Sequence, residues 1–428
     1  MEWDLPFLGR SGHTVQMKLL FTYLIIFFSG YSYAATWMVS KSGEIKIIKE
    51  ALQRASNGDT ILVKSGIYKE GNIIISKEVT LIGLDYPVVD GEYRHEVFTI
   101  TANNVVVRGF HIINVGISSL NDLAAIGGED ARNLYIADNK VERAFFGIHL
   151  ANCKSSLIEN NTLTAAAVAE NTTGNGIHMW KSDKITVRNN TVDGHRDGIY
   201  FEFVTNSLIE KNTSKNNLRY GLHFMFSHDD EYNENLFMNN GSGIAVMYSR
   251  GVTMRRNRFE ENWGASVFGL LLKEISESTI EDNLFLRNTV AIYMEACSRS
   301  NFKGNEFREN GWGIKLQASC DDNTFEKNNF IGNSFDMGTN GSMTLNTITS
   351  NYWDKYGGYD LNKDGVGDVP FHPVSLYSMI VEKMPTSVML WRSFLVFLLD
   401  RAEKVIPVVT PENLKDEKPV MKSYDISI

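Results

Sequence analysis

The sequence predicts an all-β protein that folds as a right-handed parallel β-helix with coils of about 22 residues. A repeated segment runs through the chain, as in GIHMWKSDKITVRNNTV (176–192) and GIYFEFVTNSLIEKNTS (198–214). From Gly176 onward, successive repeats begin 22, 23, 22, 26, 22 and 22 residues apart. Each repeat alternates apolar and polar residues, as short strands do. A unit of this length cannot bury its own apolar face, so the units must stack on one another.

The N-terminus carries the pattern of an export signal. Lys18 precedes an apolar run at residues 19–28. Ser32 and Ala34 are the small residues of a signal-peptidase site, so we expect the mature chain to begin at Ala35. The run is too short for a spanning helix with stop-transfer flanks, although a membrane anchor is the alternative interpretation. We therefore expect a periplasmic protein.

The composition fits a folded protein and excludes one class of partner. The 428 residues carry a net charge of −9, so we expect no nucleic-acid partner. Residues 1–16 do not fit the start of a leader, and Met17 is the expected start of translation. We assign residues 1–34 to these upstream residues and a cleaved signal peptide, and residues 35–350 to the β-helix.

Both the open end and the turns of the predicted β-helix have sequence signals. Residues 44–56 have helical periodicity, and we expect an amphipathic helix to cap the first coil. An asparagine follows the leading glycine by 14 residues in successive repeats. Asparagine tolerates the left-handed turn conformation, and stacked amides can hydrogen-bond along the axis. These residues are Asn161, Asn190, Asn212, Asn235, Asn257, Asn283 and Asn305.

Repeats in register place equivalent residues in columns along the axis, about 4.8 Å apart. The first position after the leading glycine is apolar throughout and is expected in the core. The second and fourth positions are expected to face outward. The second position reads His149, His178, Tyr200, His223, Ala245, Leu271, Tyr293 and Lys315. The fourth position reads Ala151, Trp180, Glu202, Met225, Met247, Lys273, Glu295 and Gln317.

The middle of these two columns is a candidate copper site. It comprises His178, His223, Met225 and Met247, with His228 in the adjoining turn. Thioethers are soft ligands that suit Cu(I), and imidazole suits copper generally. Met225 and Met247 lie one coil apart, so both can reach one ion. The alternative is that these side chains pack under a loop or a partner, with the histidines serving only as hydrogen-bonding groups.

The same face also permits a sugar cleft. Trp180 and Tyr200 can stack on a sugar ring, with Glu202 and Glu295 as acid and base. Glycosidic cleavage needs two carboxylates about 5–9.5 Å apart. Glu202 and Glu295 lie four repeats apart, roughly 19 Å, which argues against a hydrolase built on them.

Three cysteines lie at similar positions within their repeats. Adjacent coils would bring Cys297 and Cys320 near disulfide range, so a bridge between them is one interpretation. The other is a column of small packing residues, because serines occupy the same position in other repeats. The residues of this column are Cys153, Ser182, Ser227, Ser249, Cys297 and Cys320.

An Asp- and Gly-rich region follows the repeats at residues 351–376. It offers a weak candidate calcium site, but a full EF-hand is excluded because Phe371 occupies the position of its last ligand, a glutamate. The alternative is a structural turn held by Asx hydrogen bonds. The candidate ligands are Asp360, Asn362, Asp364 and Asp368.

Residues 377–428 are expected to form a helical extension and a tail. Pro385 can open a helix, and residues 386–405 are apolar almost all round. This segment is too short and too charged to span a bilayer. It therefore caps the last coil or docks on a membrane protein by helix-in-groove packing. The charged tail, residues 412–428, is expected to be mobile.

Two resemblances extend this interpretation. The repeats over residues 40–340 resemble the pectin-lyase-like family, which implies the fold rather than the chemistry. The stretches YGLHFMFSHDDEY, NYWDKYGGYDLNKDGVGDVPFHPVSL and RSFLVFLLDRAEKVIPVVTP, with the export signal and the β-helix, resemble the NosD family over residues 17–411. That resemblance implies a periplasmic accessory protein, not an enzyme, that is required for maturation of nitrous oxide reductase.

The resemblance to the NosD family also implies partners and a cargo. The protein would act beside an ABC-type ATPase and its inner-membrane permease in delivering copper to nitrous oxide reductase. A copper-donating chaperone, periplasmic or lipid-anchored, would be a further partner. The candidate copper site coincides with the family's His-x-Met-x-x-His stretch at His223, Met225 and His228, where Cu(I) would bind stably or in transit. The alternative function is a carbohydrate-binding or carbohydrate-active β-helix protein, in which stacked thioethers would have no use.

Overall fold

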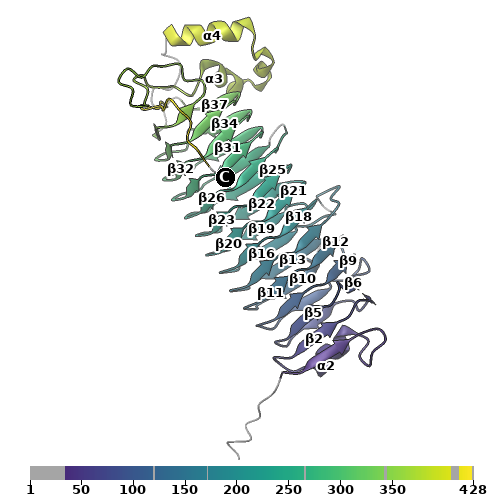
Figure 1. The fold of residues 1–428 in the computed structure, drawn as a ribbon. Helices are drawn as coiled ribbons and strands as arrows, with labels where there is room; N and C mark the ends of the chain where they lie inside the picture. The colour runs from purple at the N-terminus through teal and green to yellow at the C-terminus, as the bar shows by residue number, and fades with distance from the viewer. Residues whose placement is uncertain are drawn as a thin grey trace, which may run out of the picture.

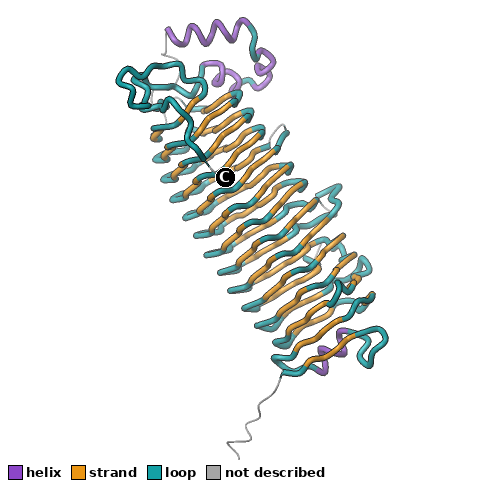
Figure 2. Tube along the Cα trace, in the orientation of Figure 1, coloured by secondary structure: helices purple, strands orange, loops and turns teal. Residues whose placement is uncertain are grey.

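The described chain is an elongated parallel β-helix with helices at both ends (Figures 1 and 2). The structure is a computed structural model, and the expected leader and Met17 lie outside the residues that it describes. The expected parallel β-helix is confirmed, because the paired strands within its three sheets all run parallel and in register. The described residues are 34–118, 121–170, 172–264, 267–341, 345–405 and 414–426.

Each coil contributes one strand to each of three sheets. The 14-stranded sheet contains β1 (Thr36–Val39), β2 (Thr60–Val63), β5 (Thr80–Gly83), β8 (Val106–Arg108), β11 (Tyr135–Ala137), β14 (Leu157–Glu159), β17 (Thr186–Arg188), β20 (Leu208–Glu210), β23 (Glu231–Asn233), β26 (Thr253–Arg255), β29 (Thr279–Glu281), β32 (Asn301–Lys303), β35 (Thr324–Glu326) and β38 (Thr347–Thr349). The 12-stranded sheet contains β4 (Ile73–Ile75), β7 (Phe98–Ile100), β10 (Ala124–Glu129), β13 (Phe146–Ala151), β16 (Ile177–Trp180), β19 (Ile199–Glu202), β22 (Tyr220–Met225), β25 (Ser242–Met247), β28 (Phe268–Lys273), β31 (Val290–Glu295), β34 (Trp312–Leu316) and β37 (Phe335–Thr339).

The third sheet has 13 strands and closes each coil. It contains β3 (Ile67–Tyr68), β6 (Val88–Asp90), β9 (His111–Ile113), β12 (Lys140–Glu142), β15 (Thr162–Thr164), β18 (Thr191–Asp193), β21 (Thr213–Lys215), β24 (Leu236–Met238), β27 (Arg258–Glu260), β30 (Leu284–Leu286), β33 (Glu306–Arg308), β36 (Asn329–Ile331) and β39 (Tyr352–Trp353). The described helices are α2 (Ile48–Arg54), α3 (Leu376–Lys383), the 3-10 helix η1 (Pro385–Leu390) and α4 (Phe394–Val405).

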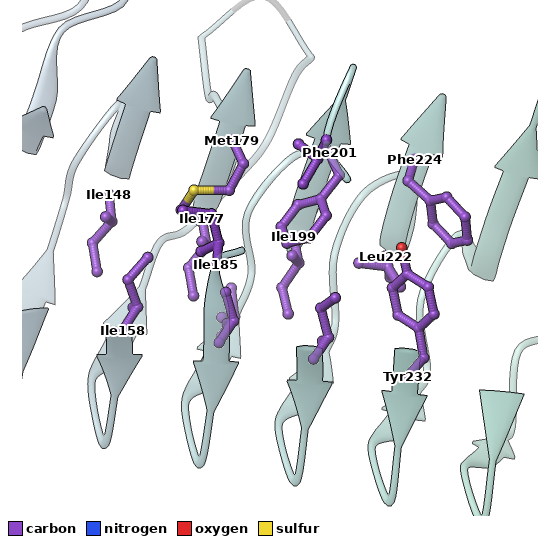
Figure 3. Close-up of a cluster of buried hydrophobic side chains, with 14 of the residues drawn as sticks. Ile148, Ile158, Ile177, Met179, Ile185, Ile199, Phe201, Leu222, Phe224 and Tyr232 are labelled. Carbon is purple, nitrogen blue, oxygen red and sulfur yellow. The ribbon is translucent and has the colours of Figure 1, made fainter. Parts of the chain in front are cut away.

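The core is a stack of apolar side chains that point into the tube from all three sheets. Figure 3 shows the part of this stack around Ile177 and Ile199. The first position after the leading glycine is fully buried, as expected, and includes Ile148, Ile177 and Leu222. Aromatic rings continue the stack through the 13-stranded sheet, with neighbouring centroids 4.1 to 5.6 Å apart. These stacked rings are Phe237, Phe259, Phe285, Phe307, Phe330 and Trp353.

The expected asparagine ladder is present and buried. Asn190, for example, donates its backbone N–H and its Nδ2–H to Oδ1 of Asn212 at 2.9 and 3.0 Å. One expectation was wrong, because the ladder asparagines do not adopt the left-handed conformation. The residue before each one does, as at Lys211 (φ 55°) and Arg256 (φ 51°). The ladder side chain must point inward to find its partners, so the sharp turn falls on its exposed neighbour.

A second asparagine ladder, which the sequence analysis missed, runs parallel to the first. It begins with the backbone N–H of His195, which donates to Oδ1 of Asn217 at 2.9 Å. The signal was available, because each member follows a first-ladder asparagine by five residues. Its asparagines are Asn217, Asn240, Asn262, Asn288, Asn310 and Asn333.

The N-terminal end is closed by α2, which buries Ile48, Ala51 and Leu52 against the first coil. The Glu70 carboxylate accepts hydrogen bonds from the first backbone N–H groups of this helix. The helix is shorter than the expected 44–56, because Ile45 forms a β-bridge with Val39 and so belongs to the strand region.

The C-terminal end is closed by α3 and by the tail. The tail was expected to be mobile, and this was wrong for its described part: Leu414 and Asp416 are buried. The first asparagine ladder continues from Asn305 through Asn328 to Asn351. Asp416 accepts hydrogen bonds from the backbone and side-chain amides of Asn351 and from the Trp353 indole. The expected helix at 386–405 is also interrupted, because Arg392 has a φ of 63° between η1 and α4.

We predict that Asp416→Ala destabilises the last coils by roughly 3 kcal/mol or more, since it leaves several buried donors without an acceptor. Chemical denaturation and hydrogen exchange of residues 345–354 will measure the loss. The matched control is Asp425→Ala at an exposed position, which should change stability by less than about 0.5 kcal/mol. Equal effects of the two substitutions would contradict the role of Asp416 as the end of the ladder.

Candidate functional site

The outer columns exist in the expected register. In the 12-stranded sheet, His149 pairs with His178, His178 with Tyr200, and Tyr200 with His223. The fourth-position column likewise places Met225 opposite Met247. Neighbouring members therefore lie about one strand spacing apart, roughly 4.8 Å. The columns bring side chains together that are 22 or more residues apart in the sequence.

Met225 and Met247 are the last residues of β22 and β25, and both are partly exposed. Their side chains leave the same face of the sheet beside the corner of the coil. Two flexible thioethers at this spacing can bind one soft ion together. We call these two residues the thioether pair.

An exposed row of aromatic side chains borders the thioether pair. The rings of Phe203 and Phe226 stack at 5.2 Å, and those of Phe226 and Tyr248 stack at 4.9 Å. Phe203 and Phe226 are 44% and 37% exposed, an unusual position for two phenyl groups. The sequence analysis missed this aromatic row, although each member is the fifth residue after the leading glycine of its repeat.

His228 is close to the thioether pair in sequence, but its lone pair is occupied. Its Nδ1 accepts a hydrogen bond from the backbone N–H of Arg250 at 3.2 Å. Burial lowers the pKa of His228, which favours the neutral imidazole. A neutral imidazole has one free lone pair, and the other nitrogen carries the proton. His228 can therefore bind a metal only if it gives up the bond from Arg250.

His223 was expected to face solvent, and this was wrong, because it is only 5% exposed. The rings of Tyr200 and Tyr220 pack against its imidazole, with centroids 5.0 and 4.7 Å away. The buried Asp197 lies behind it, with 3.8 Å between His223 Nδ1 and Asp197 Oδ2. Arg219 pairs with the other carboxylate oxygen of Asp197 at 3.5 Å. These aromatic and charged side chains therefore cover His223, although the alternation along its strand places it on the outer side of the sheet.

His178 belongs to a different part of the face. Its ring lies between those of His149 and Tyr200, with centroids 4.7 Å away on each side, tilted against His149 and edge-on to Tyr200. Burial lowers the pKa of His178 well below its ordinary value, so the ring is neutral at pH 7. Two coils and two residues along the strand separate it from Met225, which is about 12 Å between Cα atoms. At this separation, and with its ring packed between His149 and Tyr200, His178 does not lie beside the thioether pair. The structure therefore does not bring the five predicted copper ligands into a single cluster.

The carboxylates proposed for a sugar cleft are far apart. The register places Glu202 and Glu295 four coils from each other, roughly 19 Å. Glu295 also forms an ion pair with Lys273 at 3.2 Å. Trp180 remains 37% exposed and can stack on a ligand. The face can thus offer stacking surfaces, but not this pair as catalytic acid and base.

The three cysteines are free thiols buried in the core. Sγ of Cys320 accepts a hydrogen bond from the backbone N–H of Cys297 at 3.4 Å, and Oγ of Ser182 accepts one from Cys153 at 3.1 Å. Burial raises the pKa of the Cys153 thiol to about 11. This arrangement matches the column of small packing residues rather than the bridge.

The acidic turn is held by its own side chains. Asp360, Asp364 and Asp368 each accept a hydrogen bond from a backbone N–H of the same turn, at 2.6 to 2.8 Å. Asn362 donates its side-chain amide to Asp364 at 3.0 Å. These are the Asx bonds of the structural alternative. Within the part of the chain that the structure describes, no three His, Cys, Asp or Glu side chains are placed to hold a metal ion.

A large apolar surface lies at the C-terminal end. α3 packs Tyr377 and Val381 against the last coils, whereas α4 lies outermost (Figure 1). Phe394, Phe397 and Leu398 of α4 are 74%, 51% and 46% exposed. Among the described residues, none of the helices has the length and apolar character needed to cross a bilayer. Exposed apolar side chains grouped on one helix are typical of a surface that binds a partner.

Comparisons with known proteins identify relatives of this chain. The family model described as "Periplasmic copper-binding protein (NosD)" matches residues 164–358, which include the thioether pair. A Pseudomonas aeruginosa protein described as "Probable ABC transporter binding protein NosD" is 29% identical over 82% of this chain and 86% of its own length. A protein of the same description from Stutzerimonas stutzeri is 25% identical over 92% of this chain and 95% of its own length. These descriptions denote a binding role and not catalysis.

Solved structures share the fold. The catalytic unit of a GH87 alpha-1,3-glucanase from Streptomyces thermodiastaticus superposes with a TM-score of 0.56 at 18% identity, covering 72% of this chain and 65% of the glucanase chain. A second GH87 alpha-1,3-glucanase catalytic domain, in complex with tetrasaccharides, gives a TM-score of 0.52 at 13% identity, covering 75% of this chain and 67% of that domain. At these identities the likeness concerns the fold alone.

A buried histidine below the outer face makes stability depend on pH. Burial lowers the pKa of His195 to about 4, whereas the unfolded chain titrates near 6.5. The unfolded state therefore binds the proton first as pH falls, and stability is lost from about pH 6.5 down to about pH 4.

We predict that His195→Phe removes about 3 kcal/mol of this loss, measured by denaturation at several pH values. The same change at the exposed His95 is the control; equal pH profiles of the His195 variant and the wild type would contradict the prediction.

Proposed function

Because this chain belongs to the NosD family of periplasmic copper-binding proteins, we propose that it carries Cu(I) on the thioether pair and supplies it for maturation of nitrous oxide reductase beside an ABC-type transporter. The observation that carries this proposal is the register of Met225 and Met247, which puts two partly exposed thioethers one coil apart on the same face. Thioethers have little affinity for protons or hard cations, so a pair of them is suited to Cu(I).

Two ligands suit a carrier better than a permanent store. An ion held by two thioethers has open coordination positions, and a partner's ligand can enter there before the first bonds break. His228 offers a third position once it releases the N–H of Arg250. The aromatic row beside the pair excludes water on one side and gives a copper-donating chaperone an apolar surface to contact.

We predict that the double variant Met225→Leu, Met247→Leu weakens Cu(I) binding by more than about 100-fold, because it removes both sulfur atoms at nearly constant volume. The measurement is an anaerobic Cu(I) titration of the mature protein against a competing chelator.

The matched control is Met38→Leu with Met389→Leu, two exposed methionines away from the site. It should bind Cu(I) as the wild type does. If the wild type fails to compete for Cu(I), the thioether pair and the aromatic row are a contact surface for protein or carbohydrate instead. Binding that survives in the double variant would place the copper elsewhere.

The apolar surface of α4 fits docking on the transporter's permease. Its exposed phenyl and leucine side chains recur on one helix, as in helices that insert into a groove. Attachment through this end would leave the face with the thioether pair free for the copper donor and the reductase.

We predict that Phe394→Ser, Phe397→Ser and Leu398→Ser together abolish co-purification with the permease and ATPase, because they remove the apolar anchor. Cu(I) affinity should stay at the wild-type value. A control triple variant changes Val168, Leu345 and Leu361 to serine, which are exposed apolar residues in other regions. Retained co-purification of the α4 variant would contradict docking through this helix.

A further inference from the structure

The first coil holds a buried carboxylate that faces the N-terminal end of the described chain. Asp59 precedes β2 and is 4% exposed. Its Oδ1 accepts a hydrogen bond from the backbone nitrogen of Ala35 at 2.7 Å. Its Oδ2 accepts from the Trp37 indole and from the backbone N–H of Ser56, both at 2.9 Å. These backbone and indole donors hold the pKa of Asp59 below its ordinary value, so the group is ionised at pH 7.

The charge of Asp59 has no direct cationic partner among the described residues that contact it. The neighbouring cation is Lys77, and its ammonium instead donates to the carbonyl oxygens of Leu52, Gln53 and Ala55 at the end of α2. A carboxylate withdrawn from water favours a cation within hydrogen-bonding reach. Ala35, which directly precedes β1, directs its backbone nitrogen at this carboxylate.

Ala35 is also the residue at which we expect the mature chain to begin. Ser32 and Ala34 are the small residues before the expected cleavage point. The Ala35 carbonyl accepts a hydrogen bond from Thr60 N–H at 2.8 Å, and Thr36 pairs with Thr60 where β1 joins β2. Regular pairing with the β-helix thus starts at this residue.

We propose that cleavage between Ala34 and Ala35 completes this site, so that the new α-ammonium group of Ala35 forms an ion pair with Asp59 and fastens the first coil. In the cleavage, a signal peptidase adds water across the peptide bond. Ala34 leaves with a carboxylate, and the Ala35 nitrogen becomes a primary amine that takes up a proton below about pH 8. The hydrogen bond from a neutral amide to the ionised carboxylate is thereby replaced by an ion pair between an ammonium and a carboxylate.

This inference is independent of the proposed copper function. In this proposal, Asp59 binds the processed N-terminus. The ion pair stabilises β1 through Trp37 and the end of α2 through Ser56, which also contact Asp59. The opposing interpretation is that the Ala35 N–H merely continues the backbone pattern, in which case a charge at this nitrogen would add nothing.

The first test is the intact mass of the protein exported from cells with its full leader. We expect a chain that begins at Ala35, and a chain that begins at any other residue would overturn the proposal. This measurement needs no variant.

The second test compares the exported chain with one in which a Gly-Ser dipeptide precedes Ala35. The dipeptide keeps the N–H but removes its charge. We expect amide hydrogen exchange in residues 36–39 to be about fivefold faster in the extended chain. In the Asp59→Asn background the dipeptide should have no effect, which separates the ion pair from any steric disturbance. Equal exchange of the two chains with Asp59 present, or an equal effect of the dipeptide in both backgrounds, would overturn the proposal.

Discussion

The structure depends on the exact stacking of one coil on the next through parallel backbone pairing and two ladders of buried asparagine amides. Most ladder asparagines, such as Asn212 and Asn217, donate both a backbone and a side-chain N–H to the amide oxygen of the next asparagine side chain. A shift of one residue would break these bonds and turn apolar side chains outward. The ladders therefore fix the register, and the register decides which distant residues become neighbours.

Fixed register is also what creates the candidate site. A single methionine on the outer face has no equivalent beside it, but methionines in consecutive repeats lie about one strand spacing apart, as Met225 and Met247 do. The aromatic row and the stack of histidine and tyrosine rings arise in the same way. A β-helix can thus acquire a binding surface by point substitutions at equivalent positions, without any change in its backbone.

The columns, the core positions and the first ladder could be predicted from the sequence, because periodicity alone determines them. The burial of His223 could not, since it depends on Asp197, Tyr200 and Tyr220, which only the folded chain brings together. The occupied lone pair of His228 depends on the backbone of the next coil at Arg250 and has no sequence signal. The second ladder and the aromatic row did have signals, which a search for every recurring position would have found.

The two interpretations of the C-terminal apolar segment are compatible once the ends of the β-helix are considered. An open coil must be covered, and α3 covers it with Tyr377 while Asp416 from the tail supplies the last acceptor of the first ladder. The tail thus returns to the core after α4. The helix α4 therefore lies between two segments that pack on the β-helix, α3 before it and the tail after it, and does not itself cover the last coil. Its exposed phenyl groups can bind a partner without uncovering the last coil. The residues that close the fold are therefore different from those proposed to dock on a partner, and the proposal requires no opening of the last coil.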